Sequence, residues 1–282
     1  MATSLTTGSL MQGQLVTGRH GVTGSVASFR SVRNVQSHGH LKANYRKALG
    51  PSCSSTAAAG SYDVTDRTTL KRYAKRAVYD RAVVHAILDE AFVCHIGFVV
   101  DGQPFVIPTG YARDGDVLYF HGSVGSKMLR ALESGADICV TVTLLDGLVL
   151  ARSQFNTDMN YRCVVILGKS RSVSDPEEKA SALLKLTEHI IPGRTQHARA
   201  ANDRELSQTA VLAIDLNEVS AKASADKNTN DDDEDYVLPI WAGRVPLKLV
   251  PGTPEPDPRL DPAYADDIPE YILPYKRPTE KV

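Results

Sequence analysis

The sequence predicts a mainly β fold, an antiparallel β-barrel with a few helical additions. Two features support this prediction. Short apolar runs with a period of two lie between residues 92 and 121, and Asp-Gly pairs at 101–102 and 114–115 separate them; such pairs are typical of β-hairpin turns. Helical spacing of apolar residues is confined to a few segments. Antiparallel strands joined by short turns should therefore form most of the core.

The first elements follow from these patterns in chain order. Asp80 can cap a helix, because apolar residues recur after it at helical spacing as far as Ala91. Strands joined by the two Asp-Gly turns should then form a meander, followed by a short helix that Gly135 ends. The expected ranges are a helix at 80–91, strands at 92–100, 104–113 and 116–121, and a helix at 127–134.

The later elements are again mostly strands. Asp175 and the Pro-Glu-Glu that follows it predict the start of a second helix. Strands are expected at 138–145 and 147–153, as a hairpin, and at 161–173 and 209–217. The acidic run 221–236 is expected to be a solvated hairpin loop. A divalent-metal loop is the alternative, but the run lacks the Gly and the final Glu of an EF-hand, and no metal is predicted.

The two ends of the chain differ from the body in composition. Residues 1–60 contain no Asp or Glu, six Lys or Arg, and many Ser, Thr, Gly and Ala, which is typical of an organellar transit peptide. The hydroxyl-rich composition favours a chloroplast over a mitochondrion, and an untargeted disordered tail is the alternative. Residues 61–250 would form the barrel domain. The last segment, 251–282, has eight prolines and reads as an extended acidic arm.

Composition also excludes some classes of protein. With 42% apolar and 23% charged residues in 282, the chain resembles an ordinary globular protein. Its longest apolar runs are strand-sized, so no membrane association is predicted. Without the six cations of residues 1–60, 26 Lys and Arg face 33 Asp and Glu, which argues against a nucleic-acid partner. Four cysteines lack metal-ligand spacing and are expected to be reduced.

One stretch, YFHGSVGSK at 119–127, predicts an anion site. A strand ends there in His-Gly-Ser, and Ser-Lys opens a helix after a further Gly. This arrangement gathers backbone N–H groups, a hydroxyl and an ammonium in one turn. The spacing is not that of a Walker loop. A helix cap with an exposed lysine, without any ligand, is the structural alternative.

Three stretches in order resemble the pyridoxamine 5'-phosphate oxidase-like family of FMN-binding split barrels, in the branch that includes nitroimidazole-resistance flavoproteins. GQPFVIPTGYARDGDVLYFHGSVGSK (102–127) resembles its flavin-binding hairpins and phosphate turn. DMNYRCVVILGKSR (158–171) resembles its Asn-Tyr-Arg-Ser-Val-Val strand, and LPIWAG (238–243) its closing Trp strand. The resemblance covers roughly residues 66–250 and implies an antiparallel split β-barrel of Greek-key type.

The resemblance also implies a site and a partner. Backbone groups of β-strand residues would line the flavin ring, a turn would hold the phosphate of FMN, and a Trp would pack on the flavin from the second subunit of a homodimer. The ring-lining residues would be Ile107, Pro108, Thr109, Gly110 and Tyr111; the phosphate residues His121, Gly122, Ser123, Ser126 and Lys127; and the Trp is Trp241. Arg162 could add a second positive charge, or be an outward-facing strand arginine. His121 could instead be a local hydrogen-bond partner, and His85 and His95 are expected to be packing residues.

Departures from the family limit the expected reaction. True pyridoxamine 5'-phosphate oxidases carry Arg and Lys where this chain has Ile107 and Ala112, a flavin-contacting Gln where it has Cys163, and a C-terminal Arg-Leu-His-x-Arg motif that it lacks. Two functions remain. One is an organellar FMN-dependent oxidoreductase that acts on an unidentified small organic substrate, and the other is a non-catalytic module that binds a flavin, a deazaflavin or a haem-like tetrapyrrole.

Overall fold

The computed structural model describes residues 60–224 and 229–272. The expected transit peptide (1–60) lies outside this part of the chain except for Gly60, and so does the end of the C-terminal arm. Among the described residues, no helix has the length and apolar character needed to cross a membrane.

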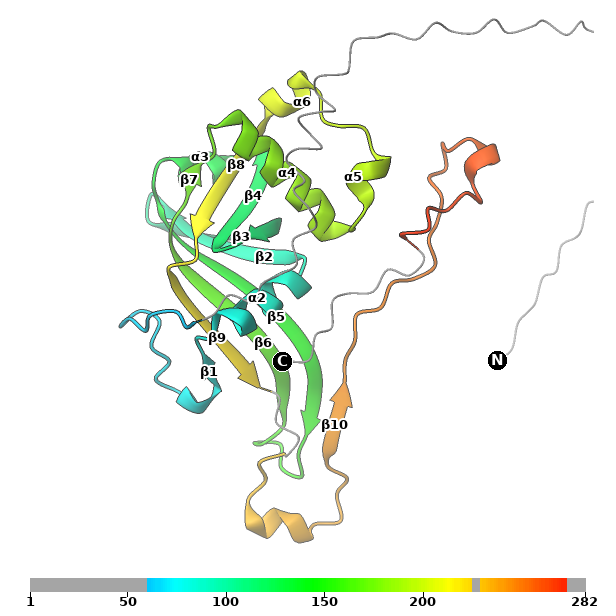
Figure 1. The fold of residues 1–282 in the computed structure, drawn as a ribbon. Coiled ribbons are helices and arrows are strands. Elements are labelled where there is room, and N and C mark those ends of the chain that lie inside the picture. Colours follow the sequence, from blue (N-terminus) through cyan, green and yellow to red (C-terminus); the bar gives the residue numbers. More distant parts are fainter. Residues whose placement is uncertain (1–59, 225–228, 273–282) are drawn as a thin grey trace, which may run out of the picture. The chain divides into compact units, whose positions relative to one another are not determined.

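The barrel is a ten-stranded antiparallel sheet with helices at its ends and on its surface (Figure 1). The strand order is β1-β9-β6-β5-β2-β3-β4-β8-β7, and β10 pairs with β5. The strands are β1 (Ala77–Val78), β2 (Val93–Val100), β3 (Gln103–Asp114), β4 (Val117–Ser123), β5 (Asp137–Leu150), β6 (Asp158–Lys169), β7 (Arg171–Ser172), β8 (Thr209–Asp215), β9 (Glu218–Ser224) and β10 (Gly243–Pro246). The helices are η1 (Ala74–Arg76), α2 (Arg81–Glu90), α3 (Lys127–Glu133), α4 (Pro176–Ile190), α5 (Arg194–His197), α6 (Asp203–Gln208), η2 (Asp233–Val237) and η3 (Pro262–Tyr264).

One strand divides its pairing between two neighbours and so splits the barrel. Over residues 103–110, β3 pairs with β2, and over 111–114 it pairs with β4. Residues 121–123 of β4 pair only with β8. The edge of β3 at 103–110 and the edge of β4 at 121–123, which face each other, are therefore both unpaired. We call this opening the split, together with the turn at 123–127 that follows β4.

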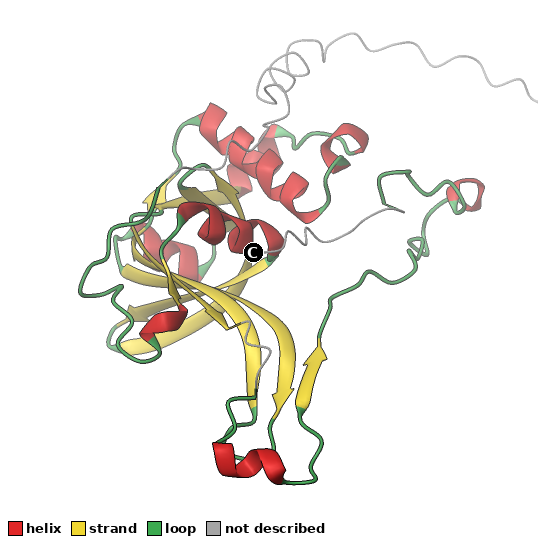
Figure 2. Ribbon diagram, turned by 60° about the horizontal axis from the view of Figure 1, so that its bottom comes forward, coloured by secondary structure: helices red, strands yellow, loops and turns green. Residues whose placement is uncertain are grey.

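Alternation along the strands produces two apolar layers. Phe120 and Leu118 of β4 face the interior, where α2 packs Ile87 and Leu88 against them in a core of fully buried side chains. Tyr119 faces the other way and packs with Val211, Ala213 and Ala182 in a second cluster beneath α4. Helices consequently lie on both sides of this part of the sheet (Figure 2). Burying apolar side chains in both layers fixes which face each β4 residue presents.

The fold class and most elements are confirmed, and the differences have physical causes. The expected hairpin at 138–153 is wrong, because β5 is one long strand with an irregularity between Leu145 and Gly147 that absorbs the residue we assigned to a turn. The start of the expected loop at 221–236 is also wrong: residues 218–224 form β9, which pairs with β6 on one side and with the short β1 on the other. The sequence of β9, EVSAKAS, has only one large apolar residue, so it gives little signal for a strand. Helices α5 and α6 were not predicted, since both are short.

Candidate functional site

The turn after β4 is held by its own backbone and hydroxyl groups. Ser126 N–H donates to Ser123 O at 2.8 Å, and Gly125 N–H donates to Ser123 Oγ at 3.3 Å. Ser126 caps α3, as expected, by accepting from Leu129 N–H at 3.4 Å. A Cβ at Gly122 would lie 3.0 Å from Leu129 Cδ1, so a larger residue would displace that core leucine. Because α3 has only seven residues, its dipole alone would attract an anion weakly.

Lys127 links the turn to β3 across the split. Its Nζ lies 4.8 Å from the centroid of the Phe105 ring, in a cation–π contact. It forms no ion pair with any described residue. The ammonium therefore keeps its three donors available while the aromatic ring fixes its position. The turn and the flavin-lining strand, which were separate predictions from sequence, are neighbours in the structure.

The unpaired edge of β3 supplies backbone donors and acceptors. On an edge strand, alternate residues direct N–H and C=O groups away from the neighbouring strand. Residues 107–110 lie on this edge, and Ile107 and the preceding Val106 are exposed. The two side chains point to opposite faces of β3, and apolar side chains next to free backbone hydrogen-bonding groups suit the edge of a flat heteroaromatic ring. Tyr111 differs, because its side chain is buried and its hydroxyl donates to Leu88 O at 2.6 Å.

His121 lies apart from the other predicted phosphate residues. It faces the α4 side of β4 and lines a cavity of about 300 Å³. The other lining residues are mostly apolar: Leu183, Leu186, Thr187, Ile190, Ala201, Glu205, Leu206 and Thr209. The imidazole makes no hydrogen bond to any described residue. Desolvation lowers its pKa below the ordinary value, so the ring is neutral at pH 7.

Arg162 is not placed to hold a cofactor phosphate. It lies on the inner face of β6, where its guanidinium binds Glu90 at 2.6 and 3.0 Å and Asp146 at 2.8 Å. The hydrogen bonds that Arg162 donates to Asp146 and Glu90 outweigh desolvation and raise the pKa of Arg162. Two carboxylates already pair with this guanidinium, so Arg162 stabilises the inside of the barrel.

Trp241 lies away from the split within one chain. It precedes β10, which pairs with residues 147–150 of β5, beyond the part of β5 that pairs with β2. Its side chain is 68% exposed. Leu148, Leu150 and Val245 nearby are also exposed, so this end of the sheet presents an apolar surface.

His95 was missed as a candidate. We expected a packing residue, but the structure exposes His95 on the outer face of β2, directly opposite Pro108 of β3. It has no hydrogen bond or ion pair to any described residue. The run 92–100 is almost wholly apolar, so its pattern does not reveal which residues face outward.

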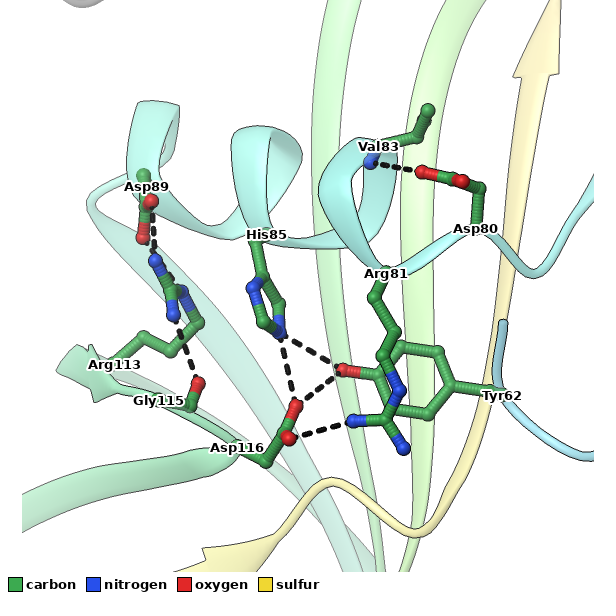
Figure 3. Close-up of polar contacts among 9 residues, drawn as sticks. All are labelled: Tyr62, Asp80, Arg81, Val83, His85, Asp89, Arg113, Gly115 and Asp116. Atoms are coloured by element: carbon green, nitrogen blue, oxygen red, sulfur yellow. Dashed lines mark hydrogen bonds and ion pairs between the residues drawn. The ribbon is translucent and has the colours of Figure 1, made fainter. Parts of the chain in front are cut away.

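A second polar cluster, which we call the latch, ties the N-terminal segment to the barrel (Figure 3). Tyr62 Oη, His85 Nε2 and Asp116 Oδ1 lie within 3.0–3.1 Å of one another, and Arg81 binds Asp116 Oδ2 at 2.6 Å. Arg81 also stacks on the Tyr62 ring at 4.3 Å. Each polar tip has a partner, so the latch is a closed network.

Burial and charge in the latch shift three pKa values. Desolvation, helped by the negative charge of Asp116, raises the pKa of Tyr62 well above its usual range. Desolvation and the nearby Arg113 lower the pKa of His85. Desolvation would raise the pKa of Asp116, but hydrogen bonds from Tyr62 and His85 and the charge of Arg81 lower it overall. Neutral Tyr62 and His85 thus surround an ionised Asp116 at pH 7.

Comparison with known proteins identifies the family. A family model described as pyridoxamine 5'-phosphate oxidase matches residues 80–223, which include the whole split. The chain belongs to the pyridoxamine 5'-phosphate oxidase family. The resemblance seen in the sequence is confirmed, and the split antiparallel barrel agrees with it.

Two solved structures are similar to this protein over most of its chain. The flavocytochrome Anf3 from Azotobacter vinelandii is 42% identical, with a TM-score of 0.70, over 75% of this chain and 97% of the other. The FAD and heme binding protein from Mycobacterium smegmatis is 36% identical, with a TM-score of 0.66, over 70% of this chain and 95% of the other. A search of curated proteins found no match.

Proposed function

We propose that this protein is a flavin-dependent oxidoreductase that binds the phosphate of FMN at the turn 123–127 and the ring along the edge of β3. The observation that carries the proposal is the contact between Lys127 and Phe105, which brings the anion-binding turn and the unpaired strand edge together. Membership of the family adds support.

The residues present fit such a cofactor. Lys127 would contribute a point charge and the turn its backbone N–H groups and hydroxyls, while residues 107–110 would offer backbone groups to the ring edge. A bound flavin supplies hydride transfer, so the protein need only position it and its substrate and exclude water. Tyr111 supports the edge from the core through its bond to Leu88 O.

The substrate is proposed to be a small organic molecule other than pyridoxamine 5'-phosphate. Ile107 is apolar and Ala112 is buried where phosphate-binding cations would be needed. Each missing charge-assisted hydrogen bond would weaken substrate binding by roughly 1.5–3 kcal/mol. Hydride chemistry on a substrate without a phosphate is compatible with the apolar side chains that β3 exposes, Val106 on its outer face and Ile107 on the other.

Titration of the purified protein tests the proposal and distinguishes the flavins. FMN, FAD and riboflavin would be added to apoprotein, and quenching of flavin fluorescence would be measured. We expect both phosphorylated flavins to bind more tightly than riboflavin, and FMN to be retained on purification. The name of the Mycobacterium smegmatis relative favours FAD. Tighter binding of FAD than of FMN would replace FMN by FAD as the cofactor and would leave the rest of the proposal unchanged. Failure of all three to bind would refute the proposal.

The homodimer and the organelle are also proposals. The exposed side chains of Val93, Val99 and Val106 on the outer sheet face, and of Trp241 near β10, would be covered by a second copy. Native mass spectrometry reports subunit number and bound cofactor together. The acid-free composition of residues 1–60 supports import into a plastid, and a uniformly cytosolic reporter fused to this segment would refute it.

Haem binding in addition to flavin is the second candidate. His121 supports it, because a neutral imidazole without a described partner lines an apolar cavity, and neutral imidazole is an iron ligand. The names of both similar structures point the same way. Adding haem to the protein should give a Soret band that His121→Gln shifts or removes, whereas His197→Gln should leave it unchanged. An identical Soret band in His121→Gln would exclude the cavity.

A further inference from the structure

We propose that His95 is the proton-handling residue of the flavin site, placed to balance the negative charge that the ring gains on reduction. The inference rests on the proposed flavin function. It goes beyond it by assigning an electrostatic task to a side chain outside the phosphate turn. Three observations lead to it: the face of the sheet on which His95 lies, its register with β3, and the charges around it.

The alternation of β2 determines the face. Cys94, Ile96 and Phe98 point into the barrel and are buried, so His95 points outward, where it is exposed. Gly97, the next residue on the outward face, has no side chain to cover the imidazole. By contrast, the outer face of β9 is covered, since Ser220 and Ser224 are buried. The outer face of β2 is therefore the open one.

Register places His95 beside the proposed ring site. It lies directly opposite Pro108 of β3 on one side and Thr141 of β5 on the other. Opposed residues on antiparallel strands share a face, with Cβ atoms roughly 4.5–5.5 Å apart. Pro108 is in the middle of the edge segment 107–110 that is proposed to line the ring. His95 is thus in register with that edge; a second imidazole, His189 of α4, lies near the end of the edge, where its ring contacts that of Tyr111.

The surroundings leave His95 without a competing charge. By the alternation of β3, Asp114 shares this side of the strand and is paired with Lys185, and the nearest titratable residue on β5 is the Cys139 thiol. Cys163 and Tyr161 lie one strand further on, and Lys222 beyond them on β9. Asp137 and Lys169 pair with each other at 3.5 Å at the start of β5. No charged side chain among the described residues stands directly beside His95 on this face, so a negative charge added there would be the main one acting on it.

The proton and electron balance is simple. Two electrons and one proton enter the ring, either as hydride from a substrate C–H bond or from dithionite and water, and one negative charge is added. His95 takes up one further proton from solvent, and its N–H groups then face that charge. Reduction is favoured wherever His95 can be protonated, so removing the imidazole should make reduction less favourable.

The test is the midpoint potential of flavin bound to the full protein. Wild type, His95→Gln and His197→Gln would be loaded with FMN and titrated with dithionite against a reference dye, from about pH 5.5 to 8. We expect the preference of the protein for reduced over oxidised flavin to be about tenfold smaller in His95→Gln than in wild type. This corresponds to a shift of the midpoint potential by about −30 mV for a two-electron couple. The bend in potential against pH should also disappear. His197→Gln should match wild type.

The outcomes separate the inference from the proposed function. An unchanged potential and pH slope in His95→Gln, with FMN bound, would overturn the inference and leave the flavin function standing. A change in subunit number without a change in potential would show that His95 serves only the contact that covers Val93 and Val99, and would also overturn the inference. Wild-type protein that binds no flavin would overturn both.

Discussion

The latch and the split both bring basic, aromatic and histidine side chains together, but they differ in how completely those groups are satisfied. In the latch, Tyr62 is 3% exposed and its hydroxyl is bonded to His85 and Asp116. In the split, Lys127 has a cation–π contact with Phe105 and no ion pair with any described residue, and Val106 on the edge of β3 is 64% exposed.

This difference teaches which polar groups hold the fold and which are available to a ligand. Buried polar groups with complete hydrogen bonding stabilise one conformation, and removing one member leaves the others unpaired. Exposed donors beside an unpaired strand edge cost little when unoccupied and can bind a ligand at once. Mutations should therefore reduce stability in closed networks and reduce ligand affinity in the split.

The largest loss of stability is expected from the closed network around Arg162. Arg162→Ala removes the guanidinium that binds the carboxylates of Glu90 and Asp146, and removing one partner of such a buried pair costs about 3–5 kcal/mol. Urea unfolding followed by circular dichroism measures it. Arg199→Ala, which breaks an exposed pair with Glu205, is the control and should change little. Equal midpoints for the two variants would contradict this account of Arg162.

A smaller loss is expected from the latch itself. Tyr62→Phe keeps the buried ring and removes the hydroxyl that joins His85 and Asp116, so the free energy of unfolding should fall by about 1 kcal/mol. Tyr264→Phe changes an exposed tyrosine and should have no effect. If Tyr62→Phe is as stable as wild type, the N-terminal segment is held by packing alone.

The smallest effect is a dependence of stability on pH. The folded protein lowers the pKa of His85, so the unfolded chain binds more protons just below the ordinary value of 6.5, and stability should fall as the pH drops through that region. His85→Gln should flatten this slope between about pH 5 and 6.5. Asp116 acts at lower pH, because its own pKa is lowered from 3.8. Parallel slopes for wild type and His85→Gln would contradict the assignment.

The sequence predicted local features of the site well. The turn 123–127, with Ser126 as the helix cap and Lys127 after it, depends on residues close together in the chain. Asp80 and Asp175 cap their helices as expected for the same reason. The family resemblance then placed the turn beside a strand edge.

Features that depend on pairing between distant strands were not predicted. Moving one residue along a strand reverses the face a side chain occupies, so the sequence did not show that Arg162 points inward and His95 outward. The small polar residues of β9 gave no strand signal, although β6 pairs with it over seven positions. His121 was grouped with the phosphate turn by proximity in sequence, yet it faces a cavity built by α4 and α6.

The central claim is that the split holds the phosphate of FMN through Lys127, and its most direct test is a titration of Lys127→Ala. FMN and riboflavin would each be titrated into wild-type and variant apoprotein by fluorescence quenching. Loss of one charged hydrogen bond, roughly 1.5–3 kcal/mol, should weaken FMN binding by about 10- to 150-fold. Riboflavin, which has no phosphate, should bind both proteins about equally, because Ser126 still caps α3. Equal FMN affinity in the two proteins would show that the turn is only structural and would contradict the account.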